Sequence, residues 1–275
     1  MTDRTGTGTG RPAITATSAA VLLLLLAMAL LGPLLAPHSP TSPVGVPYEA
    51  PGGTAPLGTD HLGRDVLSRV LSGGLPMLAT SLAAAVLGSL IGVTAGLWAA
   101  LAGARRAWAE GVVLRPLDAV AALPPLFVLL LALTALPGRA GVIAAVAVAG
   151  APLSARVVRA AAAQAVSRGH VEAAVARGES TAWLLGRELL PLVAGPAAAD
   201  LGLRFVGAIY LVTAAGFLGL GVGQTDWGLL IAEALPGAAL QPTALAVPVL
   251  LVAALGVCVN LLADDVLRRW RTVAA

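Results

Sequence analysis

Long stretches without a single charged residue constrain this chain more than any other feature of its sequence. Residues 13–36 and 70–104 contain no Asp, Glu, Lys or Arg. A helix needs about 20 mainly apolar residues to cross a bilayer, so each stretch can span a membrane. Only 11% of all residues are charged, against about 25% in soluble domains. We therefore predict an all-α, polytopic membrane protein and exclude a cytosolic enzyme.

The distribution of charges divides the chain into six predicted membrane spans. These are residues 13–36, 76–101, 119–138, a fourth from 140 to beyond Arg156, then 193–218 and 244–263. Pro124 and Pro125 are expected to break or kink the third span, because proline lacks a backbone donor and clashes with the preceding turn. A cleaved signal peptide is the alternative for the first span, but its apolar stretch exceeds the usual length of about 7–15 residues.

The composition of the remaining segments predicts how the spans are connected. Residues 1–12 are rich in Thr and Gly and are expected to form a disordered tail. Residues 37–75 are predicted to form an external loop with an amphipathic helix, capped by Thr59 or Asp60 and supported by an Asp65–Arg69 pair. Residues 76–265 form a five-helix core that includes a polar loop at 160–192, and residues 266–275 form a second tail.

Arginine positions orient the chain in the membrane. All 17 basic residues are arginine, and in a six-span topology only Arg64, Arg69 and Arg139 fall in loops opposite the termini. Because basic residues concentrate on the cytoplasmic side, both termini are predicted to be cytoplasmic. The lack of lysine excludes a Walker A phosphate loop, so this chain is not expected to hydrolyse ATP. With a single cysteine, neither a cysteine metal site nor a cofactor is predicted.

The polar loop at 160–192 carries charges of both signs and is too polar to cross the membrane. Its pattern predicts two short helices joined at Gly178, which make a knob without a core of its own. Such a knob suits docking into the groove of a partner protein. The loop resembles the EAA loop of permeases in binding-protein-dependent ABC importers at Glu172, Ala173, Ala174, Gly178, Leu190 and Pro191.

Further segments resemble the dipeptide, oligopeptide and nickel group of these permeases, and within it the second, C-type subunit. They comprise Gly58, Thr59, Asp60, Gly63, Arg64 and Asp65, then 217–221 with Trp227 and Gly228, and finally Asn260, Asp264, Asp265 and Arg268. The resemblance runs in order over about residues 13–269. The chain departs from the group at Glu188, at residues 74–76, which lack a basic residue, and at Asp200 and Arg204 in the fifth span.

The resemblance implies a type I ABC importer permease in the cell membrane of a bacterium. The implied partners are a second homologous permease in a heterodimer, two cytoplasmic ABC ATPases docked on the EAA loop, an extracytoplasmic solute-binding protein and membrane lipid, without nucleic acid. The implied cargo is a di- or oligopeptide, with nickel or a metal chelate second. No catalysis is expected of this chain. A secondary transporter or a polytopic membrane enzyme is the alternative, although no inverted repeat or acid–base cluster supports either.

Three groups of residues keep more than one interpretation. Asp200 and Arg204 lie four residues apart and form either a structural ion pair or a polar wall of the transport pathway. Asp60 could join His38 and His61 in a nickel or zinc site, but a helix cap explains it better. A stripe of small residues lets another helix approach closely, either within this chain or in a second subunit: Gly88, Gly92 and Gly96.

Overall fold

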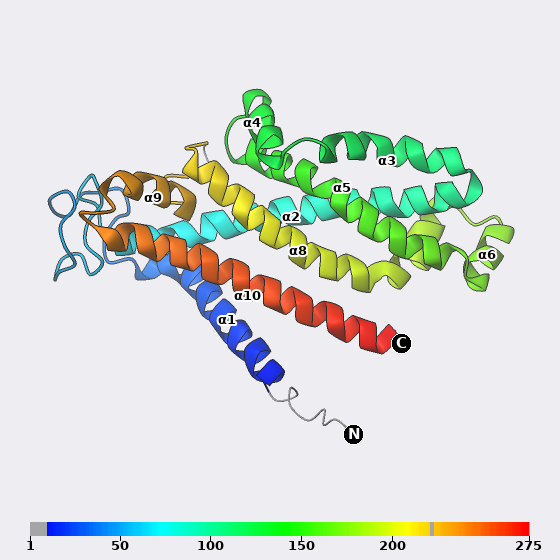
Figure 1. Ribbon diagram of the computed structural model, residues 1–275, viewed down its shortest axis with the longest axis horizontal. Helices are drawn as coiled ribbons and strands as arrows, with labels where there is room; N and C mark the ends of the chain where they lie inside the picture. The colour runs from blue at the N-terminus through cyan, green and yellow to red at the C-terminus, as the bar shows by residue number, and fades with distance from the viewer. Residues whose placement is uncertain (1–9, 221–222, 275) are drawn as a thin grey trace, which may run out of the picture.

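The computed structural model describes residues 10–220 and 223–274, and these residues form long helices without a β-sheet (Figure 1). The helices are α1 (Gly10–Leu35), α2 (Val66–Arg105), α3 (Ala107–Ala121), α4 (Pro125–Ala135), α5 (Arg139–Val166), α6 (Gly169–Ala176), α7 (Thr181–Trp183), the π-helix η1 (Leu184–Leu189), α8 (Leu190–Phe217), α9 (Trp227–Ala234), the 3₁₀-helix η2 (Leu235–Gly237) and α10 (Pro242–Ala274). The predicted all-helical architecture is confirmed.

Five of the helical segments are long and apolar enough to cross a membrane. They are Thr15–Leu35, Val66–Arg105, Arg139–Val166, Thr181–Phe217 and Pro242–Asp265. The pair α3 and α4 passes the same test together and makes a sixth candidate. The six predicted spans therefore correspond to the described helices, although several boundaries differ.

The third span differs most from its prediction. The predicted start at residue 119 is too late, because α3 begins at Ala107, and α3 and α4 are separate helices bent by 95° relative to each other. The break falls at Pro124 and Pro125, as the prolines predicted, and Pro125 occupies the first position of α4. A proline is tolerated there because the first helical N–H has no partner within the helix in any case.

Helices α2 and α5 pack closely along their length because both present small residues at the contact. A Cβ built on Gly88 would lie 2.8 Å from the carbonyl oxygen of Ala147, and one on Gly96 would lie 2.6 Å from that of Ala155. Gly92 faces Ala151 and Ser154 in the same way. Among the two interpretations of this glycine stripe, the contacts belong to packing within the chain.

The loop that precedes α2 is folded without a helix, so the predicted amphipathic helix is wrong. Helix α2 begins only at Val66, and its cap is Asp65 rather than Thr59 or Asp60. Asp65 accepts hydrogen bonds from the backbone N–H of Leu67 and of Ser68, both at 3.2 Å. The loop ends at residue 65 instead of 75, since the first turns of the long second span occupy the rest.

Both ends of the chain are more helical than predicted. Helix α1 starts at Gly10, within the predicted tail at 1–12, whose residues 1–9 lie outside the described range. Helix α10 continues to Ala274, so the predicted tail after residue 265 is helical, while the apolar part of the helix ends at Asp265. Figure 1 shows the start of α1 and the end of α10 pointing away from the end of the molecule that carries residues 37–65 and α9.

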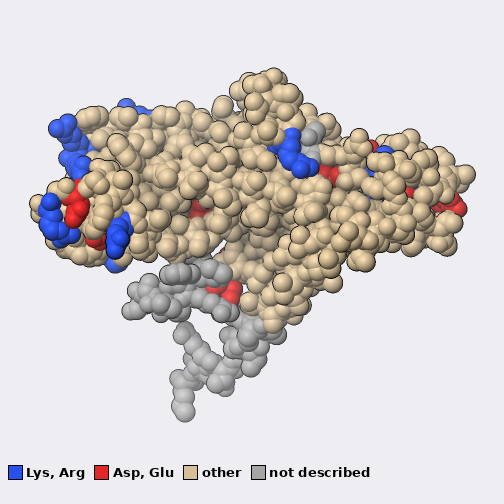
Figure 2. All heavy atoms as spheres, turned by 180° about the vertical axis from the view of Figure 1, so that it is seen from behind, with Lys and Arg blue, Asp and Glu red and all other residues tan. Residues whose placement is uncertain are grey.

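Charged side chains lie mainly at the ends of the bundle. Figure 2 shows basic and acidic residues gathered at the end that carries α6 and the α2–α3 turn, beside a broad band almost free of charge. Large apolar side chains are exposed on the helices, among them Leu82, Leu90 and Leu131. An apolar surface of this extent requires lipid or another protein to cover it. The bundle is therefore organised for a membrane, with loops at both ends.

Candidate coupling and translocation sites

The polar loop forms a short helical hairpin at one end of the bundle. Helix α6 is followed by Gly178 at φ 78°, a left-handed conformation that glycine adopts without steric cost. Ser180 then caps α7, accepting a hydrogen bond from the backbone N–H of Trp183 at 3.3 Å. Helices α7, η1 and α8 follow one another without a break, so Leu190 and Pro191 begin the fifth span directly.

The three residues of the Glu-Ala-Ala pattern have different environments. Ala174 is fully buried together with Val171, and both pack into a cluster with Leu184 and Leu189 of the second arm. Glu172 and Ala173 are exposed on the other faces of α6. Ala174 therefore anchors the hairpin, while Glu172 and Ala173 are available to a partner.

An ion pair between the hairpin arms involves a residue that departs from the resembled group. His170 on α6 lies 3.7 Å from the carboxylate of Glu188 on η1, measured from Nε2 to Oε2. The His170 side chain is half exposed. An exposed pair of this kind contributes little to stability, and the buried cluster of Val171, Leu184 and Leu189 joins the two arms.

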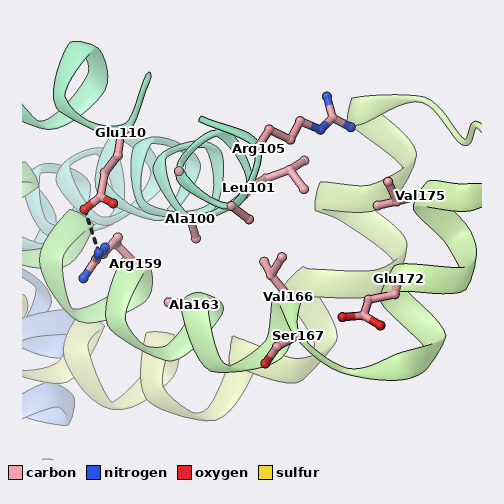
Figure 3. A pocket seen from close by; sticks show the side chains of 12 residues that line it. Ala100, Leu101, Arg105, Glu110, Arg159, Ala163, Val166, Ser167, Glu172 and Val175 are labelled. Carbon is pink, nitrogen blue, oxygen red and sulfur yellow. Dashed lines mark ion pairs between the residues drawn. The ribbon is translucent and has the colours of Figure 1, made fainter. Parts of the chain in front are cut away.

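A cavity of about 510 Å³ lies behind α6, between it and α2, α3 and α5 (Figure 3). Glu172 lines it, together with Arg105 at the end of α2 and Ser167 after α5. On its far side the guanidinium of Arg159 forms an ion pair with Glu110 at 2.7 Å. The hairpin is thus packed on one side and faces open space on the other.

Asp200 and Arg204 lie in the middle of α8 and contact each other. The distance from Arg204 Nε to Asp200 Oδ1 is 3.3 Å. The other carboxylate oxygen of Asp200 accepts a hydrogen bond from the hydroxyl of Ser154 on α5. The Asp200 side chain is 3% exposed and that of Arg204 is 20% exposed. Through its contacts with Arg204 and Ser154, the buried carboxylate of Asp200 connects α8 to α5.

Four charged residues form a compact cluster at the opposite end of the bundle. Asp60 contacts Arg64 at 2.7 Å and Arg69 at 2.6 Å, and Glu233 of α9 contacts the same two arginines at 2.9 and 2.5 Å. The predicted Asp65–Arg69 pair is wrong, because Arg69 turns to Asp60 and Glu233. Sequence reasoning did not assign Glu233 to this site, since 164 residues separate it from Arg69.

The environment of Asp60 favours its charged form. Burial alone raises the pKa of this carboxyl, but several groups act against it. The backbone N–H groups of Arg64 and Leu62, the Arg64 side chain and the charge of Arg69 outweigh burial, so the pKa lies below its ordinary value of 3.8. Asp60, His61 and Glu233 also lie within 4.8 Å of one another. The two carboxylates are already neutralised by arginines, so a cation would have to displace them.

The other residues of the predicted external segment hold this loop in shape. Thr59 donates its hydroxyl to the carbonyl of Val46 at 2.6 Å and accepts the backbone N–H of Glu49 at 2.8 Å. Gly63 has φ 75° and lies against the carbonyl of Gly45. Gly58 lies against Gln241, directly before α10. The segment therefore connects the loop to α9 and α10.

Comparison with known proteins gives consistent matches. Residues 92–272 match the family model described as binding-protein-dependent transport system inner membrane component. The di/tripeptide transport system permease protein DppC of Pseudomonas aeruginosa is 35% identical over 217 residues, covering 75% of this chain and 70% of the relative. The glutathione transport system permease protein GsiD of Pectobacterium atrosepticum is 31% identical over 220 residues, covering 78% and 72%.

A solved structure shares the fold. It shows an inward-facing conformation of the MetNI methionine ABC transporter, with a TM-score of 0.59 and 18% identity. The match covers 73% of this chain and 95% of that chain. At this identity the likeness concerns the helical architecture alone.

Proposed function

The chain belongs to the family of binding-protein-dependent transport system inner membrane components, and on this premise we propose that it carries di- or oligopeptides into the cell. It is a multi-pass permease subunit of an ABC importer in the bacterial cell membrane. Peptide cargo is supported by the relatives, whose names refer to peptide and glutathione transport. Nickel, the second cargo implied by the resemblance, has no comparable support in these relatives.

The energy for transport is proposed to come from other chains. This chain has no lysine and so no Walker A phosphate loop. We propose two cytoplasmic ABC ATPases that bind the hairpin of α6 and α7, an external binding protein that delivers the peptide, and a second, unlike permease that completes the pathway. Both chain termini would then lie in the cytoplasm with the hairpin, in agreement with the arginine distribution.

The hairpin is the observation that carries this proposal. It extends from the end of the bundle, exposes Glu172 and Ala173, and is rigidly joined to two spans by the buried side chains of Val171 and Ala174. Because η1 continues into α8 without a loop, a displacement of α6 is passed to the fifth span. The cavity behind α6 leaves room for such a displacement.

The test is the substitution Glu172→Lys, which reverses one exposed charge without touching the buried face of α6. We expect the variant to insert normally, to lose its copurifying P-loop ATPases and to lose peptide uptake. Glu49→Lys makes the same change in the loop at the opposite end and serves as the matched control for ATPase association. Normal ATPase association of Glu172→Lys would contradict the docking role. A wild-type chain that purifies without any ATPase would favour a self-contained transporter.

A further inference from the structure

A second, partly open cavity lies between helices of the bundle, beside the middle of α8. It measures about 240 Å³ and is lined by α2, the start of α4, α5 and α8. Its lining is small and apolar, with Ala84, Gly88, Pro125, Gly150 and Gly207 among the residues that face it. Arg204 is the one charged residue in this lining. The hollow therefore combines an apolar wall with a single cation.

Arg204 lies close to the midpoint of its span. Helix α8 runs from Leu190 to Phe217, so at 1.5 Å per residue Arg204 is about 20 Å from either end. A guanidinium at this depth is costly when it faces lipid, and such residues normally face the interior of the bundle or a water-filled path. The wall that carries Arg204 is therefore expected to face the path and not the hydrocarbon.

The two members of the ion pair differ in their access to the cavity. Asp200 is closed, because its side chain is 3% exposed and its oxygens face Ser154 and Arg204. Arg204 is more open, with 20% of its side chain exposed, and Asp200 is its only ion-pair partner among the described residues. That contact is not an aligned hydrogen bond, since Nε of Arg204 lacks a hydrogen-bond acceptor in the described part of the chain. Nε is buried against Asp200, whereas the two terminal nitrogens of the guanidinium have no hydrogen-bond partner among the described residues, and their N–H donors remain available.

The guanidinium of Arg204 favours an anionic hydrogen-bond acceptor. A guanidinium offers only donors, in a planar fork that fits a carboxylate through two parallel hydrogen bonds. The cavity is smaller than the 300–1,000 Å³ of a typical ligand site, so it suits one end of a peptide and not the whole molecule. Every unmodified peptide carries a carboxylate at its C-terminus.

We propose that Arg204 binds the C-terminal carboxylate of the cargo peptide as it passes the middle of the membrane, with Asp200 and Ser154 as positioning residues. This inference rests on the proposed peptide transport and adds a contact that selects the free carboxylate. Asp200 orients the guanidinium from behind, and Ser154 holds Asp200 from α5. The path then has a polar contact at its deepest point without an exposed acidic group that would repel the carboxylate.

The test compares two probes that differ only in the carboxylate: radiolabelled dialanine and dialanine amide. Uptake is measured in proteoliposomes that contain the complete transporter, with its binding protein in excess. Because the binding protein is the same throughout, a change in the ratio of the two uptake rates reports on the permease. We expect Arg204→Gln to lower dialanine uptake by about tenfold, the loss expected for a contact to a charged group, and to change dialanine amide uptake by less than about twofold.

Two further variants keep the result interpretable if Arg204→Gln folds poorly because it leaves Asp200 unpaired. Asp200→Asn with Arg204→Gln removes both charges and is expected to show the same selective loss of dialanine uptake. Arg156→Gln is the matched control, since Arg156 forms an exposed pair with Asp118 outside this cavity. Its ratio of uptake rates is expected to equal that of the wild type.

Several outcomes would overturn the inference. Equal losses for both probes, or full recovery of dialanine uptake in the double variant, would make the pair purely structural. Loss of the second permease from purified Arg204→Gln complexes would mean that Arg204 pairs with that subunit instead. If the wild type takes up dialanine normally and Arg204→Gln leaves the ratio of the two uptake rates unchanged, the Arg204 contact is refuted while the proposed peptide transport stands. Wild-type proteoliposomes that take up neither probe would refute the proposed peptide transport itself, and the Arg204 contact with it.

Discussion

Removing Arg69 should destabilise the protein more than removing Arg64, the other arginine of the charge cluster with Asp60 and Glu233. Its side chain is 2% exposed, and one nitrogen, Nη1, contacts Asp60 at 2.6 Å and Glu233 at 2.5 Å. Its Nη2 donates to the backbone carbonyl of Gln224 at 2.9 Å. With Arg64 the cluster holds two positive and two negative charges. Arg69→Met therefore leaves one buried negative charge without compensation and the Gln224 carbonyl without this donor.

The size of the effect follows from the burial of the partners. Breaking a buried ion pair by removing one member costs about 3–5 kcal/mol. We expect about 3 kcal/mol here, because the Glu233 side chain is 24% exposed and can recover some hydration. For a chain of this size that lowers the midpoint of thermal unfolding by about 6–12 °C. Arg64→Met should cost less, because the Arg64 side chain is 12% exposed.

The measurement is thermal unfolding of the assembled transporter in lipid nanodiscs, followed by size-exclusion chromatography of the protein that remains folded. The double variant Arg69→Met with Glu233→Gln restores the charge balance and should recover part of the loss. Neighbouring residues in one network are expected to be non-additive by about 0.5–3 kcal/mol. Additive losses in the double variant, or a smaller loss for Arg69→Met than for Arg64→Met, would refute the reasoning.

Three more predictions concern packing, titration and a buried hydrogen bond. Gly92→Leu should separate α2 from α5 and cost about 1–3 kcal/mol, because a Cβ there would lie 2.7 Å from the Ala151 carbonyl oxygen. The control Gly186→Ala places its methyl group in open space and should be neutral or slightly stabilising in the same unfolding assay. Burial raises the pKa of Asp226 above 3.8, so the stability that this carboxyl contributes is present below pH 3.8 and is lost as the pH rises through its raised pKa. Asp226→Asn should therefore gain stability relative to the wild type as the pH rises from acidic to neutral. A stability difference that does not change with pH would contradict this. Trp227→Phe should cost about 1–3 kcal/mol, because the fully buried indole donates a hydrogen bond to the Val70 carbonyl at 2.9 Å. Thermal unfolding followed by the fluorescence of the remaining tryptophans, Trp98 and Trp108 among them, would measure this loss.

Local patterns predicted the elements whose formation depends on nearby residues. The long apolar stretches became long helices, since a bilayer leaves the backbone no alternative to internal hydrogen bonding. Pro124 and Pro125 predicted a break, because a missing backbone donor acts within one turn. The size of the bend, 95°, depends on how α4 packs on α5 and could not follow from the prolines.

The same local rules failed where the partner of a side chain lies far along the chain. Capping preferences assigned Asp60 to a helix start, whereas Asp65 caps α2 and Asp60 is held by arginines. The i, i+4 rule paired Asp65 with Arg69, but Arg69 has a stronger, doubly charged site in Asp60 and Glu233. Local spacing contains no information on Glu233, which contacts the cluster because α9 packs against α2.

The sequence by itself determined that this chain crosses a membrane several times and carries a polar helical hairpin, because both properties arise from residues within one or two helical turns. It also identified Asp200 and Arg204 as charges within a span. Only the tertiary structure decided that Ala174 is buried while Ala173 is exposed, that the glycine stripe of α2 faces α5, and that Arg204 lines a cavity while Asp200 does not. These distinctions depend on which helix covers which face, and this is set by packing between residues that lie far apart in the chain.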